Sequence, residues 1–230
     1  MKLTSYSFLI PFLLSLSGTL FAQDVARVLD QAYGLDQTLC NGKKYLYLAP
    51  AGTRQNQYLV SPDYVPGNVT VKGKIYPDLT LNYDIFNQQL LLKYNDGTGI
   101  PKILEVSKAW LTTFSLGSRK FEFLNIENNP RFFQVLGDGP ARVLYFWRKT
   151  IDLESTVGVV NYYFSHAIRE PYVLKDGQLS PFRSKRSFIR IFPPEHKTEI
   201  RDYLRKNKVK IRKAGDKAMA DLVNYICTLN

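Results

Sequence analysis

The chain has 230 residues, of which 45% are hydrophobic, and it carries a formal net charge of +11. This hydrophobic fraction is sufficient for a packed core and excludes a globally disordered chain. The 15 Tyr and 14 Phe residues favour β-strands packed around large buried rings.

The first 22 residues have the pattern of a secretory signal peptide. Lys2 supplies a positive charge, Phe8–Leu20 is mostly apolar, and Ala22 is a small residue suited to cleavage. The apolar run is shorter than the roughly 20 residues that a membrane-spanning helix needs. We therefore expect export and a mature chain that starts near Gln23, and the alternative is a retained anchor.

The stretch Val69–Tyr94 predicts an antiparallel hairpin. Apolar and polar residues alternate on both sides of the segment Phe86–Gln89, which is long enough for a turn. A period of two puts successive side chains on opposite faces of a sheet, so one face of the hairpin should be buried. The side chains expected inside are Leu81, Tyr83, Leu90 and Leu92.

Further strands surround this hairpin. Glycine-containing turns predict three more hairpins, and Val143–Trp147 is apolar on both faces, which predicts a central strand. The predicted strand pairs are 111–116 with 119–124, 131–136 with 141–151, and 172–175 with 178–180. Shorter strands are predicted at 44–48, 58–60, 103–106 and 161–164, and a short helix at 24–34.

After Pro181 the hydrophobic period changes from two to 3.6, which is typical of helices. Ser184 is placed to cap a helix that runs to Phe192. Glu195–Asn207 predicts a second helix, and Asp216 is a candidate N-cap for the third.

Strands followed by helices indicate the α+β class. We predict a predominantly antiparallel, hairpin-built body at 23–182, arranged as a sandwich or a half-barrel. A tail of two or three short helices at 183–230 should pack on this body as part of one domain.

Only two cysteines are present, Cys40 and Cys227. In an oxidising compartment they are a candidate disulfide that would join the start of the mature chain to its last helix. The alternative is two separate thiols. Their spacing is not that of a metal or redox motif.

The sequence contains no recognised catalytic, nucleotide-binding or metal-binding motif, so we predict no cofactor. His166 is expected at a strand end, and His196 is expected to be exposed in a first helical turn. Asp78 and Asp84 lie six residues apart in the main hairpin and are a candidate acid–base pair, or alternatively part of a solvated face. Asn68-Val69-Thr70 matches a glycosylation acceptor.

Positive charge is concentrated near the C-terminus. Between Arg183 and Lys213 there are twelve basic residues and three acidic ones, which accounts for most of the net charge. Four of the basic residues fall at helical spacing and form a candidate anion-binding stripe, with a solvated surface as the alternative. The stripe residues are Lys197, Arg201, Arg205 and Lys208.

The tail beginning FIRIFPPEHKTEIRDYLRKNKVKIRKAGDK resembles the C-terminal region of uncharacterised exported proteins of Gram-negative bacteria. Leu79–Asp84, with the pattern Leu-x-Leu-x-Tyr-Asp, also recurs in such proteins. The resemblance implies a periplasmic or outer-membrane-associated protein. It implies no activity and no site residue.

These observations favour a non-enzymatic exported protein that serves as an envelope accessory or binds an unknown ligand. The predicted partners are an envelope protein or an anionic envelope lipid or polysaccharide, and not nucleic acid. The main alternative is a hydrolase that uses carboxylates to act on envelope polymers. A small outer-membrane barrel fits the number of strands, but the helical C-terminus argues against it.

Overall fold

The computed structural model describes residues 36, 38–40, 42–95, 100–126, 128–156 and 159–229. The predicted signal peptide and the predicted helix at 24–34 lie outside these residues.

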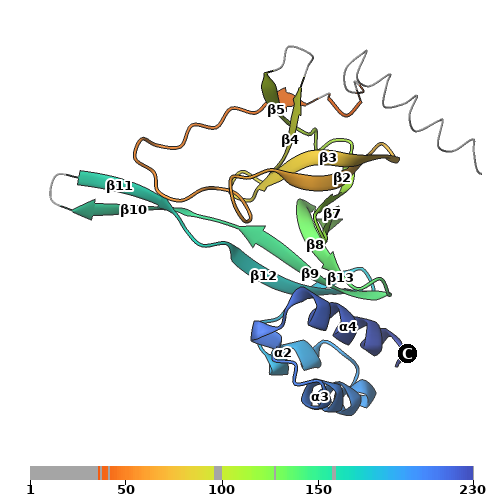
Figure 1. Ribbon diagram of the computed structural model, residues 1–230. Helices are drawn as coiled ribbons and strands as arrows, with labels where there is room; N and C mark the ends of the chain where they lie inside the picture. The colour runs from red at the N-terminus through yellow and green to blue at the C-terminus, as the bar shows by residue number, and fades with distance from the viewer. Residues whose placement is uncertain are drawn as a thin grey trace, which may run out of the picture.

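A single open sheet forms most of the described chain (Figure 1). Its eleven strands follow the order β1-β5-β4-β3-β2-β6-β7-β8-β9-β12-β13, and each strand is antiparallel to its neighbours. The strands are β1 (Lys43–Lys44), β2 (Val65–Val71), β3 (Lys74–Asp84), β4 (Gln89–Asn95), β5 (Pro101–Glu105), β6 (Leu111–Leu116), β7 (Arg119–Ile126), β8 (Asn129–Leu136), β9 (Ala141–Arg148), β12 (Ile168–Lys175) and β13 (Gln178–Pro181). The α+β class is therefore confirmed, with one curved sheet in place of two stacked sheets.

Two more strands, β10 (Ile151–Thr156) and β11 (Val159–Phe164), form a separate two-stranded sheet. They continue the β9 and β12 hairpin as a ribbon that projects from the body (Figure 1). The segment that follows β1 reaches this ribbon, where Arg54 forms a parallel bridge with Tyr163.

The main hairpin is built as the alternation predicts. In β3 and β4, Leu81 lies opposite Leu92 and Tyr83 lies opposite Leu90. All four side chains are buried in the upper core, which is the hydrophobic cluster formed mainly by strands β2 to β8. The turn between the two strands is Ile85–Gln88, within one residue of the predicted position.

β9 is a central strand, as predicted, and it separates two groups of buried side chains. Val143 and Tyr145 face the helices, whereas Leu144 and Phe146 belong to a smaller cluster with Phe133. β9 pairs with β12 along its whole length and with β8 from Val143 to Tyr145, so it is an interior strand of the sheet.

The helical tail consists of α2 (Lys185–Arg190), the short 3-10 turn η1 (Pro194–His196), α3 (Lys197–Lys206), the second 3-10 turn η2 (Ile211–Lys213) and α4 (Asp216–Cys227). Ser184 caps α2 as predicted, and the backbone N–H of Ser187 donates to its hydroxyl. α4 packs on β9 and β8, so the tail and the sheet share one core (Figure 1). In the β8–β9 turn, Gly137 has a φ of +87°, and a Cβ there would lie 2.4 Å from Val223 Cγ1.

Four local predictions are wrong. The predicted strand at 141–151 is interrupted, because β9 ends at Arg148 and β10 begins at Ile151 in a separate sheet. In place of the predicted strand at 44–48, β1 covers only Lys43–Lys44. One more backbone hydrogen bond joins the Tyr45 N–H to the carbonyl of Ile103, and the Tyr45 hydroxyl donates to Asp84. The predicted strand at 58–60 is reduced to a single bridge at Tyr58. The N-cap of α4 is Gly215, and Asp216 is the first helical residue, where its carboxyl group interacts with the sheet.

Candidate functional site

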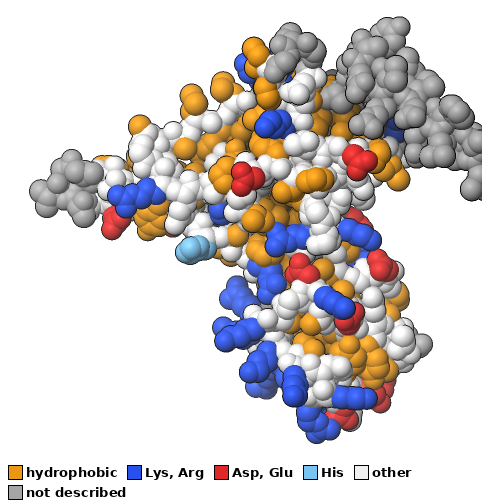
Figure 2. Space-filling model, in the orientation of Figure 1, with side chains coloured by type: hydrophobic (Ala, Val, Ile, Leu, Met, Phe, Trp, Pro, Cys, Tyr) orange, Lys and Arg blue, Asp and Glu red, His pale blue; other side chains and the backbone are white. Residues whose placement is uncertain are grey.

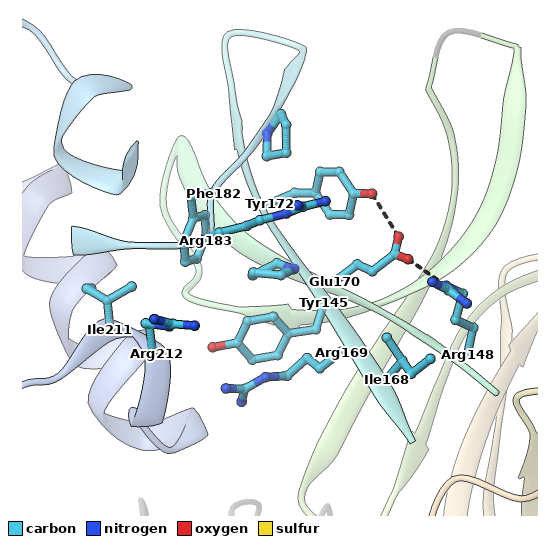
Figure 3. A pocket seen from close by; sticks show the side chains of 12 residues that line it. Tyr145, Arg148, Ile168, Arg169, Glu170, Tyr172, Phe182, Arg183, Ile211 and Arg212 are labelled. Atoms are coloured by element: carbon cyan, nitrogen blue, oxygen red, sulfur yellow. Dashed lines mark hydrogen bonds and ion pairs between the residues drawn. The ribbon is translucent and has the colours of Figure 1, made fainter. Parts of the chain in front are cut away.

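A groove of about 410 Å³ lies where the helical tail meets the edge of the sheet (Figure 3). Its lining comes from β9, β12, the end of β13 and η2. The residues are Tyr145, Arg148, Ile168, Arg169, Glu170, Pro171, Tyr172, Pro181, Phe182, Arg183, Ile211 and Arg212.

The groove exists because β13 is shorter than β12. β13 pairs with β12 only from Tyr172 to Lys175, whereas β9 pairs with β12 from Ile168 onward. Pro181 has no N–H to continue the ladder, and the chain turns away at Phe182, whose N–H donates to the carbonyl of Pro171. The first half of β12 is therefore a free sheet edge, and side chains from both faces of the sheet reach it.

On one side of the groove, the negative charge of Glu170 is already paired with Arg148. Arg148 Nε donates to Glu170 Oε1 at 2.5 Å, and the hydroxyl of Tyr172 donates to Glu170 Oε2 at 3.1 Å. Burial alone raises the pKa of the Glu170 carboxyl, but the hydrogen bonds from Arg148 and Tyr172 outweigh it and hold that pKa below its ordinary value. The only carboxylate that lines the groove is thus already engaged.

Arg169 is held in place by its neighbours. Its guanidinium carbon lies 4.4 Å from the centre of the Tyr145 ring, and its Nη1 lies 3.9 Å from Asp216 Oδ1. Asp216 also accepts a hydrogen bond from Gln134 at 2.7 Å, and Gln134 in turn accepts one from the indole N–H of Trp147. This network connects the start of α4 to the sheet and fixes Arg169 at the groove wall.

Two further arginines have uncompensated charge. Arg183 follows the end of β13 and Arg212 lies in η2, and both side chains are exposed. Neither forms an ion pair within the described part of the chain. Lys and Arg side chains also gather over one side of the helical part in the view of Figure 2. The groove is therefore positively charged, with four arginines and one carboxylate in its lining.

Tyr145 contributes a hydroxyl group to this surface. The residue is only 1% exposed, and among the described residues its hydroxyl has no hydrogen-bond partner. Figure 3 shows the hydroxyl and the Arg169 guanidinium directed to the same side, toward the segment that carries Arg212. Burial raises the pKa of Tyr145 to about 12, while Arg169 opposes the rise and Asp216 adds to it. At neutral pH this group is therefore a hydrogen-bond donor.

The predicted stripe is only partly on one helix. Arg201 and Arg205 are exposed on α3, Lys197 is half-buried, and Arg205 donates to Asp202 at 2.9 Å. Lys208 lies beyond the end of α3 with a φ of +53°, because the helix ends at Lys206. None of the four residues lines the groove. Whether the stripe binds anions stays a prediction.

The two cysteines of the candidate disulfide are not joined in the structure. Cys40 packs against the upper core, and Cys227 packs against the core between the sheet and the helices. Cys227 Sγ instead donates to the carbonyl of Ala141 at 3.4 Å. The prediction of a bridge therefore has no support from this arrangement.

The other candidate residues are dispersed. Asp78 is exposed, whereas Asp84 is fully buried under the β3–β4 turn. Six residues of strand separate them by about 20 Å, which is far more than the about 5–9.5 Å between paired catalytic carboxylates. His166 is exposed, and His196 is half-buried where exposure was expected.

Most of the residues that line the groove have no distinctive pattern in the sequence. Arg183 and Arg212 belong to the basic segment of the sequence, but no motif marks Tyr145, Arg148 or Arg169 as site residues. A usable signal was present, because Arg148, Arg169 and Glu170 are charged residues within otherwise apolar strand segments. Charged side chains are rarely buried unless they are paired, so a charged residue in an apolar strand is a candidate for a site.

Comparison with known proteins finds no matching family model, curated protein or solved structure. Within the described residues, no three His, Cys, Asp or Glu side chains are grouped as metal ligands. Those residues also include no helix of the length and apolarity needed to cross a membrane.

Proposed function

We propose that this chain is a non-enzymatic, exported binding protein of the bacterial envelope that holds an anionic ligand in the arginine groove. The ligand class is an anionic lipid headgroup or polysaccharide of that envelope. The observation that carries the proposal is the groove itself, in which Arg183 and Arg212 face solvent without an acidic partner among the described residues.

Arginine suits this role because its planar guanidinium donates paired hydrogen bonds to carboxylate, sulfate and phosphate oxygens. The guanidinium charge is permanent, so the groove remains positive at any physiological pH. The groove also has the volume of a small-molecule site, which is typically about 300–1,000 Å³.

Binding is tested by titration calorimetry with phosphate, sulfate, citrate and glucose 6-phosphate, and with glucose as the neutral control. We expect at least one anion to bind and glucose not to bind. The double variant Arg183→Gln and Arg212→Gln should lose at least about tenfold in affinity, because each charge-assisted hydrogen bond contributes about 1.5–3 kcal/mol.

The stripe provides a matched control for overall charge. A variant with Gln at positions 197, 201, 205 and 208 loses four charges, twice as many as the groove variant, yet none of them lines the groove. We expect this variant to bind as tightly as the wild type. An equal loss in both variants would mean that general electrostatic attraction, and not the groove, holds the anion.

Export is tested separately by expressing the full chain in a Gram-negative host and measuring the intact mass of the product in the periplasmic fraction. The charged start, the apolar run and Ala22 lead us to expect a mature chain that begins near Gln23. A product that retains Met1 would contradict the exported part of the proposal and leave the groove unaffected.

A further inference from the structure

Within the proposed anion-binding function, we infer that the inner end of the groove is a phosphoryl subsite for a sugar phosphomonoester, formed by the Tyr145 hydroxyl and the guanidinium groups of Arg169 and Arg212. The inference rests on the proposed function and specifies its ligand.

The Tyr145 hydroxyl is the first indication of a ligand oxygen at this place. The aromatic ring is packed into the core between β9 and the helices, yet its hydroxyl has no partner among the described residues. The hydroxyl is not fully enclosed, in contrast to that of Tyr64, so it reaches the groove and can donate to a molecule held there. A ligand oxygen at the groove wall would accept this hydrogen bond.

Arg169 is the second donor, and it is preorganised. Stacking on Tyr145 and the contact with Asp216 limit its rotamers before any ligand arrives. Binding to a group that is already ordered loses less conformational entropy. Asp216 lies 3.9 Å from Arg169, which is longer than a hydrogen bond, so the guanidinium retains donors for a ligand.

Arg212 is the third donor and comes from a different part of the chain. It lies in η2, next to the buried Ile211, which fixes this short segment against the core. The strands and η2 therefore approach the same space from different directions (Figure 3).

The number and direction of the donors favour a phosphoryl group over a carboxylate. A carboxylate has two oxygens in one plane, and a single arginine can satisfy both. A phosphomonoester has three terminal oxygens arranged tetrahedrally and carries nearly two negative charges at neutral pH. Two guanidinium groups and one hydroxyl match that charge and that geometry.

The remaining space indicates what carries the phosphate. A volume of about 410 Å³ exceeds what a bare inorganic ion would fill, and the lining also includes the rings of Pro171, Pro181 and Tyr172. Such walls pack against the C–H face of a sugar ring. Arg183 lies at the rim, where it can meet a further oxygen or a second charge of the ligand.

Calorimetric titrations with glucose 6-phosphate, inorganic phosphate and glucuronate test the inference. Glucuronate is a sugar of similar size that carries a carboxylate. We expect glucose 6-phosphate to bind at least about tenfold more tightly than either of the other two. Inorganic phosphate as the tightest ligand would refute the sugar requirement, and equal binding of glucuronate would refute the phosphoryl preference.

Tyr145→Phe removes only the hydroxyl and should weaken glucose 6-phosphate binding about tenfold. Tyr203→Phe is the matched control, because Tyr203 lies on α3 and does not line the groove, and it should change the affinity less than threefold. Arg212→Gln changes an exposed residue and gives a second variant should Tyr145→Phe fold poorly. We expect it to lose at least about tenfold for the phosphate ester.

The outcomes separate this inference from the proposed function. If anions bind and Arg183→Gln with Arg212→Gln weakens them, but Tyr145→Phe has no effect and glucuronate binds as well, the phosphoryl subsite is wrong and the anion-binding function stands. If no anion binds the wild-type protein, both are wrong.

Discussion

Replacing Tyr83 by Ala is expected to lower the free energy of unfolding by about 4 kcal/mol, within the range for deleting a fully buried aromatic ring. Tyr83 is completely buried in β3, and its ring packs edge-on against three phenylalanine rings at centroid distances of 5.4–5.8 Å. Those rings are Phe114, Phe121 and Phe132. They come from β6, β7 and β8, so removing Tyr83 leaves a cavity shared by four strands.

Urea denaturation followed by circular dichroism measures this effect. Tyr83→Phe is the control, because it keeps the ring and removes only the hydroxyl that donates to Gln88 Oε1 at 2.6 Å. We expect the control to cost about 1 kcal/mol, the net contribution of one hydrogen bond. An unchanged denaturation midpoint in Tyr83→Ala would show that this hairpin face is not the core.

Replacing Asp84 by Ala is expected to cost about 3 kcal/mol, because it leaves several buried donors without an acceptor. Asp84 is fully buried and accepts four hydrogen bonds. Its Oδ1 accepts from the backbone N–H groups of Phe86 and Asn87, and its Oδ2 accepts from the Asn87 side chain and the Tyr45 hydroxyl. One side chain thus shapes the β3–β4 turn and also anchors the segment that follows β1.

Asp84→Asn separates these two contributions. The amide oxygen can still accept from both backbone N–H groups, whereas the new NH2 group faces two donors, Tyr45 and Asn87. We expect a smaller loss of about 1–2 kcal/mol, together with faster proteolytic cleavage in the segment 45–58. Equal losses in the Ala and Asn variants would show that the turn hydrogen bonds contribute little to stability.

Asp84 also illustrates why residue spacing alone does not define a site. In the sequence, Asp78 and Asp84 alternate with apolar residues and fall on one face of an ideal strand. In the structure β3 contains an irregularity near Asp78, whose φ is +54°, and the two ends of the strand have different surroundings. Asp78 meets solvent, whereas Asp84 is covered by the β1–β2 connection. Spacing alone does not report what covers a strand.

The arginine groove could not be predicted from the sequence for a similar reason. Its lining residues are separated by up to 67 positions, from Tyr145 to Arg212. Arg169 is beside Trp147 because of the β9–β12 register, and Arg212 lines the same groove although it comes from η2. No sequence pattern around Arg169 or Arg212 predicts that the two residues line the same groove.

The sequence predicts secondary structure correctly where a single local physical rule dominates. Alternation with a period of two identified the buried residues of β3 and β4, glycine-containing turns identified the hairpins, and Ser184 identified the start of α2. Each of these signals depends on backbone geometry and solvent exclusion within a few residues of chain. Tertiary structure alone decided that β13 stops short of β12, that η2 lies against the exposed strand edge, and that the Tyr145 hydroxyl opens into the resulting groove. Those facts depend on which distant segments pack together, and packing complementarity between distant segments leaves no periodic trace in the sequence.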